Sequence, residues 1–163
     1  MDVDAGLDAV ISAFIRNPEL SSIQYKASQN LIVMEMILKG NIDHEPQQVF
    51  CQKTIASLKL FHRLRSINNK EMRMYFDNRG NISILTFCRD IFSLAEEEID
   101  LYVRLVGLDF STVLLRESDE IALPDDSFYD LKKRLLQKLH KQEEPYKNIF
   151  AYRDRGKMFV FDK

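Results

Sequence analysis

Residues 82–105 read ISILTFCRDIFSLAEEEIDLYVRL, and their apolar side chains repeat at the spacing of one helix face. These side chains follow one another at steps of three or four residues, at Ile84, Cys88, Ile91, Ala95, Ile99 and Tyr102. A helix of this length, about 24 residues, would be roughly 36 Å long, which is the width of a small domain. The stretch therefore predicts a long central helix against which other elements pack.

Other segments show the same spacing and predict helices around this centre. They are residues 3–14, 22–39, 47–67 and 127–141. Asn17-Pro18 ends the first, because the residue before a proline avoids the helical conformation. Residues 72–76 are expected in a short turn, and residues 108–123 suit a helix or a strand equally. The predicted fold class is mainly α, a multi-helix bundle of about five or six helices around the long central helix.

Residues 146–163 predict a C-terminal β-hairpin. Two apolar runs, 149–152 and 158–161, flank a basic loop in which Gly156 suits the left-handed position of a hairpin turn. Alternation assigns Ile149, Ala151, Met158 and Val160 to one face and Phe150, Tyr152, Phe159 and Phe161 to the other. Because an isolated hairpin is marginal in water, one face should pack on the helices. The other face then needs further strands, a helix or another chain.

The composition indicates one globular domain spanning residues 1–163, with 45% apolar and 29% charged residues. The net charge of −2 argues against a protein that coats nucleic acid over its whole surface. The two cysteines, Cys51 and Cys88, are expected to be buried thiols in a reducing compartment. The acidic start lacks a signal peptide, and no apolar run is long enough to span a bilayer. A cytoplasmic or nuclear location is expected.

Basic residues gather in two places. The first is residues 47–67, where Lys59 and Arg63 lie one turn apart and no acidic residue occurs between Pro46 and Lys70. This patch either docks an anion or an acidic partner, or is neutralised by acidic runs of the same chain. The second joins helix 127–141, which carries Lys133, to the hairpin loop. A helix followed by a hairpin with a basic loop is the order in which a winged-helix module presents its recognition helix and its wing.

Residues suited to chemistry show no recognisable arrangement. The histidines and cysteines are not spaced as zinc ligands, and the chain has neither a glycine-rich phosphate loop nor a nucleophile elbow. We therefore expect no enzyme activity, no metal, no cofactor and no small-molecule substrate.

The predicted function is a non-enzymatic protein–protein interaction domain, an adaptor or assembly subunit of a larger complex, whose partner is another protein chain or a second copy. The alternative is a nucleic-acid-binding module with a winged-helix-like C-terminal half formed by helix 127–141 and the basic hairpin loop. The predicted partner-binding residues are Phe150, Tyr152, Phe159, Phe161, Lys59, Arg63, Lys133, Arg153, Arg155 and Lys157.

Overall fold

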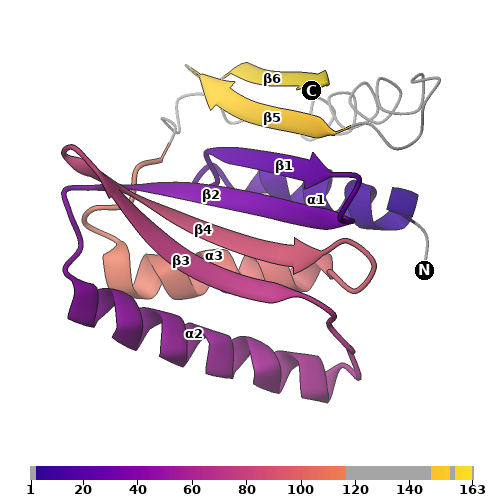
Figure 1. Ribbon diagram of the computed structural model, residues 1–163, viewed down its shortest axis with the longest axis horizontal. Helices are drawn as coiled ribbons and strands as arrows, with labels where there is room; N and C mark the ends of the chain where they lie inside the picture. The colour runs from indigo at the N-terminus through magenta and orange to yellow at the C-terminus, as the bar shows by residue number, and fades with distance from the viewer. Residues whose placement is uncertain (1–2, 117–147, 155–156, 163) are drawn as a thin grey trace.

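The computed structural model describes residues 3–116, 148–154 and 157–162, and these form helices packed on an antiparallel sheet (Figure 1). The elements in chain order are α1 (Val3–Arg16), β1 (Ser22–Lys26), β2 (Leu31–Lys39), α2 (His44–Leu64), β3 (Met72–Arg79), β4 (Ile82–Asp90), α3 (Glu96–Phe110), β5 (Ile149–Asp154) and β6 (Lys157–Asp162). The strand order is β3-β4-β2-β1-β5-β6. The three helices of the described part of the chain share one hydrophobic core with one face of this sheet.

The prediction of a mainly α bundle around a central helix is wrong, because residues 82–105 divide into a strand and a helix. β4 pairs with β2 on one side and β3 on the other, and the chain turns after Asp90 before α3 begins at Glu96. Here both faces of β4 are buried: Leu85 and Phe87 on one face and Thr86 and Cys88 on the other, so the strand is mostly apolar on both sides. Its apolar run therefore matches helical steps as well as strand alternation, and this ambiguity produced the error.

The helix predicted for residues 22–39 is also wrong, for the same reason. β1 and β2 form an antiparallel pair, in which Ile23 lies opposite Met34. Asn30 makes the turn between them with a left-handed backbone, φ 54°. Met34 and Val33 point to opposite faces of β2, yet both are buried, so the strand reads as apolar all round. The predicted turn at residues 72–76 is likewise part of a strand, β3.

Three of the predicted elements are confirmed: the first helix, the helix over residues 47–67, and the C-terminal hairpin. The hairpin does not stand apart as a wing, because β5 pairs with β1 and extends the sheet. In the ambiguous stretch 108–123, α3 continues to Phe110 and Leu114 forms an isolated bridge with Leu38. The predicted helix 127–141 and residues 117–123 lie outside the described residues.

The core lies between the sheet and the helices and is rich in aromatic contacts. Phe87 of β4 packs on Tyr102 of α3 with 4.4 Å between ring centroids. Phe50 of α2 packs on Phe110 of α3 at 5.0 Å. Such pairs add about 0.5–1.5 kcal/mol each to the free energy gained by burying their surface. Met36 of β2 is fully buried in the same core.

At Gly6, α1 lies close to the turn after β4. A Cβ atom at Gly6 would lie 2.5 Å from the backbone oxygen of Ile91. Gly6→Ala should therefore displace α1 and lower the free energy of unfolding by about 1–3 kcal/mol. Gly107→Ala is the matched control, because a Cβ there meets nothing within 4 Å. It should raise the free energy of unfolding by about 0.5–1 kcal/mol. Urea denaturation measures both, and a Gly6 variant as stable as the wild type would contradict the packing.

Candidate functional site

The most unusual residue of the interior is Arg89, which is completely buried on the helix-facing side of β4. Its Nε donates to Oε2 of Glu98 on α3 at 2.6 Å, and its Nη2 donates to Oε1 of the same carboxylate at 3.0 Å. Its Nη1 donates to Oδ1 of Asp90 and, at 3.1 Å, to the hydroxyl of Ser93. The guanidinium thus binds one carboxylate in a fork and a second one at its tip, which satisfies it without water.

His62 of α2 joins this group, which we call the Arg89 cluster: Arg89, Asp90, Ser93, Glu98 and His62. The imidazole Nε2 hydrogen-bonds Oε1 of Glu98, and both side chains are buried. Within the described part of the chain, the other imidazole nitrogen, Nδ1, has no hydrogen-bond partner. The cluster therefore ties α2, β4 and α3 to one another through a single buried carboxylate, that of Glu98.

Asp90 accepts hydrogen bonds from the segment before β3 and from the turn after β4. Its Oδ1 accepts the backbone N–H groups of Lys70 and Glu71 at 3.0 and 3.1 Å. Its Oδ2 accepts the N–H of Ser93 at 3.1 Å and the hydroxyl of Ser93 at 2.6 Å. Burial would raise the pKa of Asp90, but the bonds from Ser93 and the two backbone N–H groups, with the charge of Arg89, hold the pKa below its ordinary value. Both carboxylate oxygens are thereby occupied.

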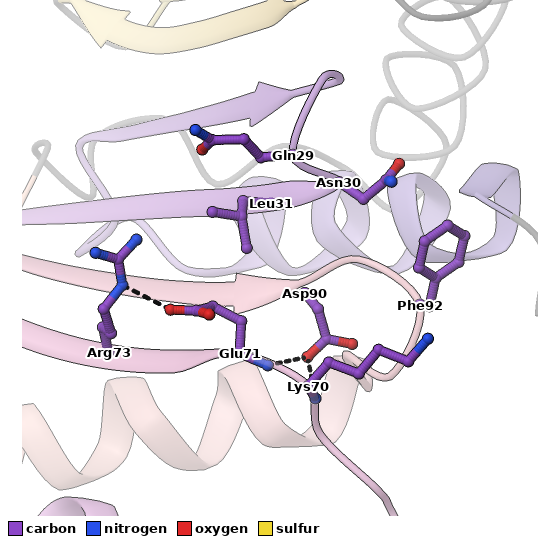
Figure 2. Close-up of a pocket in the computed structure, with 8 residues that line it drawn as sticks. All are labelled: Gln29, Asn30, Leu31, Lys70, Glu71, Arg73, Asp90 and Phe92. Carbon is purple, nitrogen blue, oxygen red and sulfur yellow. Dashed lines mark hydrogen bonds and ion pairs between the residues drawn. The ribbon is translucent and has the colours of Figure 1, made fainter.

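A pocket of about 580 Å³ opens next to this cluster (Figure 2). It is lined by Gln29, Asn30, Leu31, Lys70, Glu71, Arg73, Asp90 and Phe92. In its wall, Arg73 Nε pairs with Glu71 at 2.7 Å, and the Lys70 ammonium lies 6.0 Å from the Phe92 ring centroid. Neither a cysteine, a histidine nor a serine is among these lining residues. The pocket offers charge of both signs but no thiol, hydroxyl or imidazole, and its one buried acid, Asp90, is already hydrogen-bonded.

Three of the predicted aromatic residues, Phe150, Tyr152 and Phe159, come together on the hairpin. Tyr152 of β5 stacks on Phe159 of β6, with 5.1 Å between ring centroids and an interplanar angle of 16°. Phe150 lies 6.0 Å from Tyr152 on the same side of β5. Phe161 is opposite Phe150 in the strand register. Phe150, Tyr152 and Phe159 form what we call the aromatic row. Because Ala151 on the alternate face is buried in the core, this row occupies the face of the sheet that points away from α1.

The predicted basic residues are not brought together. Arg153 is half-buried, and its guanidinium lies 4.4 Å from the ring centroid of Phe14 on α1. Lys59 and Arg63 are exposed on α2, which lies beside the β3 edge and far from the hairpin (Figure 1). Lys157 belongs to β6, opposite Asp154 in the register. Lys133 and Arg155 lie outside the described residues.

Sequence reasoning missed the Arg89 cluster, although one signal was available. An arginine within an otherwise apolar strand has to find buried anions, and Glu98 stands on the apolar side of the following helix. Of the two cysteines, Cys88 is buried as expected, whereas Cys51 is only half-buried.

Comparison with known proteins finds no matching family model, no matching curated protein and no matching solved structure. Among the described helices, none combines the length and the apolar character that crossing a bilayer requires. Residues 3–116, 148–154 and 157–162 also contain no group of three or more metal-ligating side chains placed to hold an ion.

Glu98→Gln should strongly destabilise the protein, because it removes the charge that balances Arg89 where no water can replace it. Breaking such a buried pair costs about 3–5 kcal/mol of unfolding free energy. Glu96→Gln is the matched control, since Glu96 pairs with Arg16 at the surface, where the cost is below about 1 kcal/mol. Equal losses in urea denaturation would show that the cluster does not hold the fold.

The ionised Asp90 carboxylate should make the protein more stable at neutral pH than at acidic pH. A carboxylate whose pKa is lowered by folding stabilises the protein above its unfolded pKa, about 3.9, and this contribution is lost as the pH falls through the folded pKa. Asp90→Asn should therefore be less stable than the wild type at neutral pH. The difference should shrink below about pH 4. Thermal unfolding followed from neutral to acidic pH measures it, and a difference independent of pH would contradict the assignment.

Proposed function

We propose that this protein is a non-enzymatic interaction domain, an adaptor or assembly subunit that binds another protein chain through the outer face of β5 and β6. One observation carries the proposal. The aromatic row points away from α1, and Phe159, stacked on Tyr152, keeps 40% of its surface exposed. Exposed aromatic side chains held rigid by stacking are typical anchors of protein interfaces.

The position of β6 supports the same surface. β6 is the last strand in the sheet order and pairs only with β5 among the described strands. An edge strand presents backbone N–H and C=O groups that can pair with a strand of another chain. Side chains on alternate positions then supply specificity, and here Phe159 occupies such a position. A partner can therefore add a strand to β6 and cover the aromatic row at once.

The interior supports a binding role rather than catalysis. The charged groups of the Arg89 cluster are paired with one another, since Glu98 and Asp90 both accept hydrogen bonds from Arg89. Their geometry connects elements and leaves no free acid–base pair directed into the adjacent pocket. The supported role is thus a rigid scaffold that presents surfaces.

Phe159→Ser should remove the anchor and weaken partner binding by about 30-fold, the effect of losing a hot spot of roughly 2 kcal/mol. Tyr75→Ser is the matched control, because Tyr75 is an aromatic residue of somewhat greater exposure, 49% against 40%, on the opposite edge strand. Affinity capture from the source cells, with sedimentation of the purified chain for self-association, compares the two variants. The same partners and the same sedimentation for Phe159→Ser as for the wild type would disprove the proposal.

A further inference from the structure

The solvent side of α2 carries a line of exposed apolar residues. Val49, Leu60 and Leu64 keep 56%, 50% and 76% of their surface exposed, and Ala56 is exposed between them. The four residues follow one another at steps of seven, four and four, so they lie along one side of the helix. This ridge is about 22 Å long. Single exposed leucines are ordinary at a protein surface, but Ala56, Leu60 and Leu64 follow one another turn by turn, and such a group of exposed apolar side chains indicates a binding surface.

Basic side chains flank the ridge, and the described part of the chain supplies no ion-pair partner for them. Lys59 and Arg63 are exposed one turn apart, and neither has a carboxylate within 4.0 Å among the described residues. Four of the five acidic residues of α3 are paired elsewhere. Asp100 and Glu96 pair with Arg16, Glu98 is buried with Arg89, and Asp109 holds Lys53 at 2.7 Å. The intramolecular neutralisation that the sequence left open as one alternative is therefore not made by these acids of α3.

Together, the ridge and its flank define the chemistry of an occupant. An apolar ridge packs into the groove of another helix, and unpaired cations one turn apart repel unless anions approach them. We propose that this side of α2 binds an acidic amphipathic helix of a partner protein, whose leucine-like residues meet Val49, Leu60 and Leu64 and whose carboxylates meet Lys59 and Arg63.

Two other classes of macromolecule fit this surface less well. A nucleic acid backbone would gain nothing from the exposed aliphatic ridge. An anionic membrane is a broad surface and would also meet Glu97, an exposed acid of the neighbouring helix α3. A single acidic helix is narrower and needs to meet only the ridge and the two cations beside it.

This second surface is separate from the aromatic row. α2 packs beside β3, whereas β6 is at the other end of the sheet order (Figure 1). One partner can therefore occupy each surface without touching the other. The inference goes beyond the proposed function and stands or fails on its own variants.

Photo-crosslinking in the source cells tests the occupant. A benzoylphenylalanine placed at Leu64 of the full chain should crosslink to a protein segment rich in Asp and Glu with apolar residues at helical spacing. The same probe at Tyr75, on the face of the sheet away from the helices, is the control and should not capture that segment. Capture of lipid, nucleic acid, a second copy of this chain or a segment without acidic residues would overturn the proposal, as would equal yields from both probe positions.

The captured segment, made as a synthetic peptide, then tests the charges. Its affinity for the purified chain should fall by about tenfold or more in the double variant Lys59→Glu, Arg63→Glu, and should fall with added salt. Lys39→Glu is the matched control, because Lys39 is an exposed lysine at the end of β2 and does not belong to α2. Fluorescence anisotropy measures the affinities. Binding of the double variant as tight as that of Lys39→Glu would disprove the proposed complementarity.

Discussion

The fork between Arg89 and Glu98 is the constraint on which the packing of this protein depends. A guanidinium inside an apolar layer is very costly unless it is paired and fully hydrogen-bonded. Arg89 has no exposed surface, so α3 has to bring Glu98 to it and the turn after β4 has to bring Asp90 and Ser93. These demands fix where α3 begins relative to the sheet.

The carboxylates of Glu98 and Asp90 also bind groups outside the Arg89 fork. Glu98 also binds His62, which fixes α2 against α3, while Asp90 accepts the backbone of Lys70 and Glu71 at the start of β3. The pocket beside Asp90 is a consequence of these turns, and its charged walls are already paired or exposed to solvent. A rigid interior of this kind suits a protein that presents surfaces to partners. Apolar packing around the cluster, such as Phe87 on Tyr102, supplies most of the stability.

The two surfaces proposed for binding differ in physical character as well as in place. The row on β5 and β6 is aromatic and lies at a sheet edge, where backbone groups add to the contact. The α2 ridge is aliphatic with a basic flank, and its contact would depend on salt. A partner suited to one surface is poorly suited to the other. This asymmetry is compatible with the proposed adaptor role, in which the two surfaces bind different proteins.

The sequence by itself determined the elements whose signals are local. Asn17-Pro18 ends α1, the helical spacing over residues 47–67 is that of α2, and the alternation around Tyr152 and Phe159 is that of the hairpin. Only the tertiary structure decided that β2 and β4 are strands, because a strand buried on both faces has the apolar pattern of a buried helix. The tertiary structure also determined which residues meet in the Arg89 cluster, since Glu98 and His62 are 36 residues apart in the chain. Their contact arises only when strand pairing and helix packing place both on one side of the sheet.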